Sequence, residues 1–327
     1  MTVLQKLREL LQTEHVFEDK PLALYTTLKV GGSAQYYFEA TTSADIARAV
    51  KAAVSLDIPY FVFGGGSNIV VGDGGIPGLT IHNRARKIAI TAMKGKISHG
   101  ESIGSVMVTA ESGALMNQLV RFTADEGLSG LEYHLGLPGT VGGALYMNSK
   151  WTHPVTYVGD VLYEAEVVSR DGTVKTVRQS YFDFGYDQSI LQQTKETVLT
   201  ATFQLTRLAP KIVWERAQGA LAYRTETQPK GVNTAGCTFR NIPKSEAMRI
   251  PTPNHITSAG YLVDTVGLKN FQIGNAAFSD KHANFIINKG EATAQDVKAL
   301  IDTAKSKVHA RYGIEIEPEI VLVGKFS

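Results

Sequence analysis

The residues of this 327-residue chain that are best suited to chemistry begin with a glycine-rich loop after the apolar run FVF. The loop consists of Gly64, Gly65, Gly66, Ser67 and Asn68. Successive backbone N–H groups that no side chain covers form a concavity that binds anions, so this loop is a candidate phosphate site. It has neither the Lys-Ser/Thr of a P-loop nor the spacing of the dinucleotide fingerprint. A tight surface turn is the alternative, but such a turn normally needs only one or two glycines.

A second glycine-rich loop lies further along the chain, in the segment GLPGTVGG. Its candidate ligand-binding residues are Gly136, Pro138, Gly139, Gly142 and Gly143. Two such loops, in successive domains, could hold the two ends of one diphosphate. They favour a nucleotide-like cofactor that spans a domain boundary, although Gly142 and Gly143 could instead permit close packing of a helix.

A lone thiol and a C-terminal carboxylate are the candidate catalytic groups. Cys237 lies in NTAGCTFRN, between small and polar residues. A core cysteine usually has large apolar neighbours, yet an inert buried thiol is the commoner case. In IEIEPEIVLVG an alternating strand would place Glu315, Glu317 and Glu319 on one face, a pattern that taken alone favours a solvated acidic surface. The single cysteine and the absence of HxxxH or HxH spacing predict no metal site and no internal disulfide.

Hydrophobic periodicity and breaker residues predict the elements that must position these groups. They are, in chain order, an N-terminal helix, a helix over 44–55 capped by Thr42 and Ser43, a buried strand before the first glycine loop, short β segments between 87 and 112, a helix over 116–125, a hairpin at Asp171-Gly172, a strand over 197–208, a boundary near 210 followed by a helix, a helix from Thr293 to Gly313, and a final strand from 314. The length predicts two or three domains.

Composition excludes several classes of protein. Hydrophobic residues make up 43% and charged residues 20%, which is typical of a globular chain and not of a disordered or fibrous one. The 33 basic and 31 acidic side chains form no basic stripe, so nucleic acid is not an expected partner. We expect no signal peptide and no membrane span, and the single cysteine suits the reducing cytoplasm.

Six segments follow one another along residues 22–324, namely YTTLKVGGSAQ, FVFGGGSNIVV, GLSGLEYHLGLPGTVGGALYMN, NTAGCTFRN, SAGYLVDTVGLKNFQIGNAAFSDKHANFIIN and GIEIEPEIVLVG. Together, and in this order, they resemble the motifs of the UDP-N-acetylenolpyruvoylglucosamine reductase, or MurB, family of flavoenzymes. The length of the central region and the Gln228-Pro229 segment are similar to the shorter, type II branch. Each motif is only moderately specific, but six in one order argue against coincidence.

The resemblance implies an α+β, three-domain FAD-binding fold of the vanillyl-alcohol-oxidase/PCMH-like kind. FAD-binding subdomains over residues 1–80 and 81–210 would precede a C-terminal substrate-binding α/β domain over residues 211–327. The two glycine loops would hold the FAD diphosphate, one from each subdomain. Tyr146 and Asn148 are candidates for contact with the flavin, unless LYMN is a buried strand.

The resemblance also implies a reaction, the NADPH-driven reduction of UDP-N-acetylglucosamine enolpyruvate to UDP-N-acetylmuramate in peptidoglycan precursor synthesis. The UDP-sugar and NADPH would be the small-molecule partners. Cys237 stands where the family has a proton-donating Ser in A-G-S-x-F. A thiol, with an ordinary pKa of about 8.5, is mostly protonated at neutral pH and is a stronger acid than a hydroxyl. Glu319 matches the family's C-terminal catalytic Glu, which assists at the substrate carboxyl group.

One position departs from the family. The family's catalytic Arg lies in Y-R-x-S, and the matching segment here reads Tyr186-Asp187-Gln188-Ser189, so a carboxylate replaces a cation that stabilises negative charge. Three explanations stay open: another Arg such as Arg224 or Arg240 takes the role, Asp187 turns away, or the activity is altered. The alternatives to the reductase are another FAD-dependent oxidoreductase on the same scaffold and a catalytically impaired flavin- or UDP-sugar-binding homologue. The retained thiol and glutamate favour the reductase.

Overall fold

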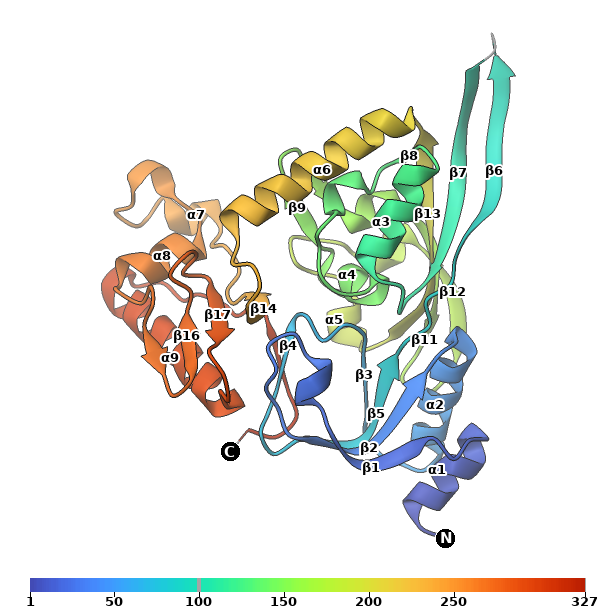
Figure 1. Cartoon of the computed structure of the whole chain (residues 1–327), viewed down its shortest axis with the longest axis horizontal. Coiled ribbons are helices and arrows are strands. Elements are labelled where there is room, and N and C mark those ends of the chain that lie inside the picture. The colour runs from blue at the N-terminus through green and yellow to red at the C-terminus, as the bar shows by residue number, and fades with distance from the viewer. Residues whose placement is uncertain (99–100, 327) are drawn as a thin grey trace. The chain divides into compact units, whose positions relative to one another are not determined.

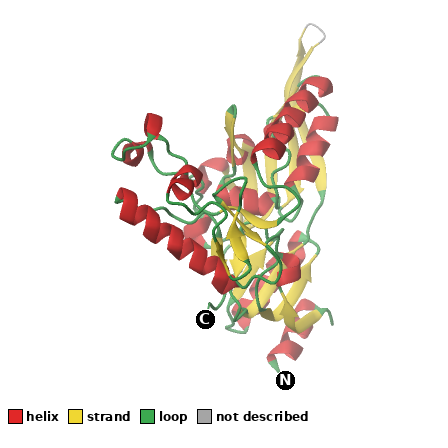
Figure 2. Ribbon diagram, turned by 60° about the vertical axis from the view of Figure 1, so that its left-hand side comes forward, coloured by secondary structure: helices red, strands yellow, loops and turns green. Residues whose placement is uncertain are grey.

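The computed structural model describes residues 1–98 and 101–326, with the backbone alone described over 94–98 and 101–103. The chain forms two compact units, each of which mixes helices and strands (Figures 1 and 2). Unit 1 comprises residues 1–18, 36–65 and 78–224, and unit 2 comprises residues 19–35, 66–77 and the chain from 225 onwards. Within the described residues, none of the helices combines the length and the apolar character that a membrane crossing requires.

The N-terminal part of unit 1 is built on a four-stranded sheet in the order β1-β2-β5-β3. Its elements are α1 (Val3–Leu11), β1 (Val16–Pro21), β2 (Ser33–Ala40), α2 (Ser43–Ser55), β3 (Tyr60–Phe63) and β5 (Ile76–Asn83), of which β1, β2 and β5 extend a few residues into unit 2. Apolar faces of α1 and α2 pack with this sheet in one hydrophobic core. The predicted N-terminal helix, the helix over 44–55 and the strand before the first glycine loop are confirmed.

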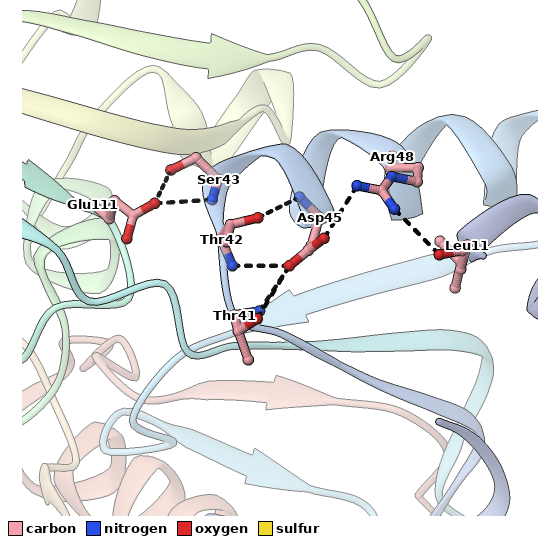
Figure 3. Close-up of polar contacts among 7 residues, drawn as sticks. All are labelled: Leu11, Thr41, Thr42, Ser43, Asp45, Arg48 and Glu111. Carbon is pink, nitrogen blue, oxygen red and sulfur yellow. Dashed lines mark hydrogen bonds and ion pairs between the residues drawn. The ribbon is translucent and has the colours of Figure 1, made fainter. Parts of the chain in front are cut away.

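Polar contacts at the start of α2 explain why the helix begins at Ser43 (Figure 3). Thr42 Oγ1 accepts a hydrogen bond from the Asp45 N–H at 3.1 Å, and the Asp45 carboxylate accepts one from the Thr42 N–H at 3.0 Å. This is a capping box, which satisfies two backbone donors at once. The Glu111 carboxylate also accepts hydrogen bonds from the N–H and the hydroxyl group of Ser43, at 3.1 and 2.9 Å. The start of α2 is therefore held both by its own residues and by a distant strand.

The second sheet of unit 1 has the order β12-β11-β13-β7-β6, with β8 also paired to β13. Its strands are β6 (Ile88–Ser98), β7 (Glu101–Glu111), β8 (Leu128–Ser129), β11 (Leu162–Val168), β12 (Val174–Arg178) and β13 (Thr197–Arg207). The predicted hairpin at Asp171-Gly172 and the predicted strand over 197–208 are confirmed. The predicted β-structure between 87 and 112 is confirmed, but β6 and β7 form two long antiparallel strands that run beyond their neighbours and not several short segments (Figure 1). Residues 99 and 100 of that predicted region lie outside the described residues.

Helices and short segments of unit 1 pack with the second sheet. They are α3 (Met116–Asp125), η2 (Glu132–His134), α4 (Val141–Met147), β9 (Lys150–Thr152), β10 (Val155–Tyr157), η3 (Val158–Val161), η4 (Gln179–Phe182), α5 (Leu191–Thr194) and α6 (Pro210–Thr227), the last of which ends in unit 2. Their apolar side chains and those of the sheet form a second hydrophobic core, separate from that of the N-terminal part. The predicted helices over 116–125 and after 210 are confirmed.

Unit 2 contains a four-stranded sheet in the order β14-β17-β16-β15 and a parallel pair of β4 with β18. Its elements are η1 (Ala23–Tyr25), β4 (Ile69–Val71), β14 (Asn233–Cys237), α7 (Lys244–Ala247), η5 (Pro253–His255), α8 (Ala259–Thr265), β15 (Gln272–Ile273), β16 (Ala276–Phe278), β17 (Phe285–Asn288), α9 (Ala294–Tyr312) and β18 (Val321–Val323). The predicted helix from Thr293 to Gly313 is confirmed, with Thr293 as N-cap and Gly313 in the left-handed conformation. The final strand begins at Val321 and not at 314 as predicted, although Ile314, Ile316 and Ile320 are buried in alternation with exposed glutamates.

Candidate active site

The two glycine-rich loops meet inside unit 1. A Cβ atom added to Gly65 would lie 3.0 Å from the Cα atom of Gly139, and one added to Gly64 would lie 2.3 Å from Thr140 Oγ1. The contact at Gly64 is shorter than real Cβ atoms show, and the contact at Gly65 is tight enough that the opposite backbone would have to shift, so the packing of the two loops favours glycine at both positions. Sequence reasoning predicted the two loops as partners, and the structure brings Gly64 against Thr140 and Gly65 against Gly139.

Backbone donors remain available along the first loop. Among the residues that the structure describes, no hydrogen bond uses the N–H group of Gly65, Ser67 or Asn68. Gly143, in the second loop, has open space where a side chain would be, because a Cβ atom there would meet only Thr140 Oγ1, at 3.6 Å. Nothing in the packing of the described residues requires glycine at 143. A diphosphate needs uncovered N–H groups and room for close approach, and within unit 1 the N–H group of Gly65 and the open glycine at 143 fit such a group.

Gly66, Ser67 and Asn68 belong to unit 2, where the backbone turns sharply. Gly66 has a φ of +60°, and a Cβ atom there would lie 2.4 Å from the Tyr25 carbonyl oxygen. Glycine is therefore required at 66 both by conformation and by packing. The Asn68 side chain donates to the Glu319 carbonyl oxygen at 3.2 Å, and the Asn68 carbonyl oxygen accepts from the Val321 N–H at 2.9 Å.

A histidine that sequence reasoning missed contacts the backbone at the start of the first loop. The His82 ring, 6% exposed, stacks on Phe63 with centroids 4.5 Å apart, and its Nδ1 lies 2.6 Å from the Tyr37 hydroxyl oxygen. Burial lowers the pKa of His82 to about 4, helped by the nearby Arg84 charge, while a hydrogen bond to the Gly64 backbone opposes this effect. A neutral, buried ring thus holds the backbone at the start of the loop. The one signal for this role in the sequence is a histidine within a strand of mostly apolar residues.

The second loop leads into a short helix that ends at Asn148. Thr140 is the N-cap of α4, and Asn148 is its C-cap with a φ of +46°. The buried Asn148 side chain donates to the Gly185 carbonyl oxygen at 2.9 Å and accepts from the Gly159 N–H at 3.1 Å. The alternative interpretation of LYMN as a buried strand is wrong, because Tyr146 lies within the helix.

Asp187, the residue that departs from the family pattern, lies in a tight turn near the C-terminal end of α4. Gly185 and Gln188 close the turn, and Asp187 has a φ of +51° with 6% of its surface exposed. Ser189 Oγ and Gln192 Nε2 both donate to the Tyr146 carbonyl oxygen, at 2.7 and 3.0 Å. The structure therefore places position 187 next to the C-terminal end of α4. Asp tolerates the left-handed conformation better than Arg does, which gives a local reason for the residue found there.

A backbone bulge in unit 2 presents Cys237. The register of β14 against β17 shifts between Thr234 and Cys237, and Gly236 within the bulge has a φ of +88°. A Cβ atom at Gly236 would meet nothing within 4 Å, so glycine is favoured there by conformation alone. Cys237 is partly exposed and unoxidised at the end of β14.

The structure brings Cys237 and Glu319 together on adjacent backbones. The Glu319 N–H donates to the carbonyl oxygen of Thr238, the residue after Cys237, at 2.8 Å. Phe239 and Pro318 form a bridge beside this bond. Because Asn68 also contacts Glu319, three predicted site residues, namely Cys237, Glu319 and Asn68, lie in one region of unit 2.

A buried asparagine that sequence reasoning did not single out fixes the Cys237 segment. Asn284 is 3% exposed, and its side chain accepts from the Phe239 N–H at 2.9 Å and donates to the Phe239 carbonyl oxygen at 2.8 Å. The Asn284 carbonyl oxygen accepts from the Thr238 N–H at 2.6 Å. These three bonds satisfy the N–H groups of Thr238 and Phe239 and the carbonyl oxygen of Phe239, directly after the thiol. The polar run SDKHAN before an apolar strand was the available signal.

Comparison with known proteins decides the family. Residues 228–323 match the model of the UDP-N-acetylenolpyruvoylglucosamine reductase C-terminal domain, and residues 34–178 match that of an FAD binding domain. The UDP-N-acetylenolpyruvoylglucosamine reductase of Agathobacter rectalis is 34% identical over 99% of both chains, and that of Bacillus subtilis is 35% identical over 98% of both. The chain belongs to the UDP-N-acetylenolpyruvoylglucosamine reductase family. The resemblance that six motifs indicated is therefore confirmed.

Solved structures agree with this membership. The crystal structure of the family's enzyme from Thermus caldophilus is 30% identical, has a TM-score of 0.73, and covers 94% of this chain and 98% of that one. A VAO-type flavoprotein from Myceliophthora thermophila, 13% identical with a TM-score of 0.56, shares the fold over 94% of this chain and 85% of its own. The predicted α+β FAD-binding fold of the vanillyl-alcohol-oxidase kind is confirmed.

Proposed function

We propose that this chain catalyses the NADPH-driven reduction of UDP-N-acetylglucosamine enolpyruvate to UDP-N-acetylmuramate, in the cytoplasm, as a step of peptidoglycan precursor synthesis. The observation that carries the proposal is the full-length relationship to the reductase family, together with the retained neighbours Cys237 and Glu319. FAD, when bound, supplies the hydride chemistry between NADPH and the enolpyruvyl double bond. The other partner is the UDP-sugar.

The glycine loops would bind the FAD diphosphate through their backbone. The uncovered N–H groups of Gly65, Ser67 and Asn68 would donate to phosphate oxygens, while Gly143 leaves room for their approach. Gly136, Pro138 and Gly142 would shape the second loop, and Asn148 would end its helix near the flavin. Packing also favours glycine at 64, 65 and 66, so contacts within the chain contribute to the shape of the first loop.

Cys237 and Glu319 would act on the substrate. Hydride addition to one alkene carbon leaves negative charge next to the carboxylate, so a proton must be delivered to the other carbon. The Cys237 Sγ–H is the proposed donor, presented by the bulge at Gly236. Glu319, held by its backbone bond to Thr238, would assist at the substrate carboxyl group.

We also propose that the chain divides into three domains, over residues 1–80, 81–210 and 211–327. Two separate hydrophobic cores within unit 1 support a division of that unit into two FAD-binding subdomains. The core of unit 2 supports a distinct C-terminal domain, although segments before residue 80 contribute to it.

An anaerobic absorption experiment tests the proposed reaction. The FAD-loaded protein should lose its flavin absorbance with NADPH and regain it with the enolpyruvyl UDP-sugar. Cys237→Ala should slow the second step by about 10²- to 10⁴-fold and leave the first unchanged, whereas Cys237→Ser should retain most of the rate because the family uses a hydroxyl. Reduction by NADPH without return of absorbance on addition of the sugar would contradict the proposed acceptor.

The buried carboxylate of Asp187 favours one alternative, a homologue that binds flavin and UDP-sugar but is catalytically impaired. Asp187 brings negative charge to a position where the family has a cation, and it is 6% exposed. Such a protein would bind the UDP-sugar tightly in a titration, yet its reduced flavin would not be reoxidised. The absorption experiment separates the two functions.

A further inference from the structure

We infer that the ammonium group of Lys150 contacts the carboxylate of the enolpyruvyl UDP-sugar and supplies the positive charge that the family takes from the Arg at position 187. This inference rests on the proposed reductase function. It adds a candidate to Arg224 and Arg240, which the sequence alone had suggested for that role.

The position of Lys150 connects it to the turn at Asp187. Lys150 begins β9, two residues after Asn148, whose side chain donates to the carbonyl oxygen of Gly185. The Lys150 Nζ atom lies 4.8 Å from the centroid of the Tyr186 ring. Tyr186 directly precedes Asp187 in the chain, so the cation and the turn occupy one region of unit 1.

Two aromatic rings hold the ammonium group. Besides the Tyr186 ring, the Tyr157 ring has its centroid 5.8 Å from Lys150 Nζ. Ring faces attract a cation but leave its hydrogen-bonding capacity largely unused, because a π face is a weak acceptor. Two rings therefore orient the side chain without neutralising it.

A second lysine shows the contrast. Lys175 Nζ lies 4.5 Å from the Tyr181 ring centroid, but it also pairs with the Glu196 carboxylate at 2.7 Å and donates a hydrogen bond to the Tyr181 hydroxyl oxygen at 2.7 Å. For Lys150 no such carboxylate lies within ion-pair distance among the residues that the structure describes. The charge of Lys175 is used within the fold, whereas that of Lys150 remains available to an anion.

A cation at this place would favour the reaction. The negative charge that develops next to the substrate carboxylate is stabilised by a preorganised cation in the same region, which a carboxylate at position 187 does not supply. A lysine on β9 can supply the charge when the residue at 187 is Asp, which the left-handed backbone there favours.

Stopped-flow reoxidation of the NADPH-reduced flavin by the enolpyruvyl UDP-sugar tests the inference. Lys150→Met should slow reoxidation by about 10²-fold, as the loss of one charge-stabilising group does, and Lys150→Arg should recover at least tenfold of that loss. Reduction by NADPH and flavin content should match the parent protein. Lys307→Met is the matched control, because Lys307 also lies over a ring, that of Phe271 at 5.4 Å, and it is an exposed residue of unit 2.

The outcomes separate this inference from the proposed function. If the parent protein is reoxidised by the sugar and Lys150→Met is equally fast, the inference is wrong while the function stands. A slower reduction by NADPH with unchanged reoxidation, or equal losses in Lys150→Met and Lys150→Arg with loss of flavin, would also overturn it. Failure of the parent protein itself to be reoxidised refutes the function. Asp187→Arg added to Lys150→Met gives a further check, because recovered reoxidation would show that the two positions supply the same charge.

Discussion

His134 predicts an acid sensitivity that can be assigned to one side chain. The residue ends η2, two residues before Gly136, and its ring is completely buried. Within the described residues, neither ring nitrogen has a hydrogen-bond partner. Burial lowers the pKa of His134 to about 3, helped by the positive charge of Arg224 and opposed by the Glu132 carboxylate. The folded chain therefore keeps this ring neutral at every physiological pH.

The sign and size of the effect follow from linkage. The folded-state pKa of about 3 lies below the ordinary value of 6.5, so between these values the unfolded chain binds a proton that the folded chain does not. Stability from this group is complete above pH 6.5 and is lost as the pH falls. Between pH 8 and pH 5 the loss amounts to about 2 kcal/mol.

Urea unfolding followed by tryptophan fluorescence measures this loss. The two tryptophans of the chain, Trp151 and Trp214, both belong to unit 1, which also contains His134. We expect His134→Leu, which keeps an apolar side chain in the site, to lose about 2 kcal/mol less than the parent protein between pH 8 and pH 5. His15→Gln, at an exposed position of the same unit, is the control for the removal of a histidine.

A pH dependence as steep in His134→Leu as in the parent protein would refute the reasoning. It would mean that the ring is solvated or hydrogen-bonded in the folded state, so that its pKa is close to the ordinary value. Residual acid sensitivity in the variant is expected, because His82, with a pKa of about 4, contributes in the same direction.

Four further predictions concern the loops and the framework. Gly65→Ala, whose Cβ atom would lie 3.0 Å from Gly139 Cα, should cost about 1–3 kcal/mol in urea unfolding. Gly143→Ala should leave stability within about 0.5 kcal/mol of the parent value but weaken FAD binding in a fluorescence titration, since its Cβ atom would meet only a hydroxyl at 3.6 Å; unchanged FAD affinity would argue against the proposed cradle. Glu111→Ala should cost about 1–3 kcal/mol by thermal or urea unfolding, because three hydrogen bonds to its carboxylate are lost, and a neutral result would remove it as a cap of α2. Gly236→Ala should slow flavin reoxidation while costing about 1 kcal/mol of stability, because alanine resists the φ of +88°; unchanged kinetics would show that the bulge does not position the thiol.

Local signals in the sequence predicted the elements well where one segment decides its own structure. Thr42 and Thr293 each cap a helix as predicted, because a capping box involves residues only three apart. The final strand was predicted too early, because the alternation of apolar residues after Gly313 sets burial but does not supply a neighbouring strand. Val321 begins the strand because its N–H finds the Asn68 carbonyl oxygen, a partner far away in the sequence.

The sequence predicted which residues form the candidate site, but it did not predict the contacts that each of them makes. The glycines at 64 and 65 were expected to expose N–H groups, and the structure adds that a side chain there would strike the second loop. His82 could not be found from the sequence, since its role depends on Tyr37 and Phe63 lying beside the ring. A single histidine on a strand carries no periodic signal, so only the fold reveals it.

Position 187 shows why a sequence motif is an incomplete account of a site. The motif shows that a carboxylate replaces a cation, and that change alone leaves altered activity as one of three explanations. In the folded chain the same position is a left-handed turn tied to the end of α4, with the ammonium group of Lys150 held over the neighbouring Tyr186 ring. Charge acts through space, so a residue from another strand can supply what the motif lost. The reoxidation rates of the Lys150 variants decide whether this chain has kept its chemistry by that route.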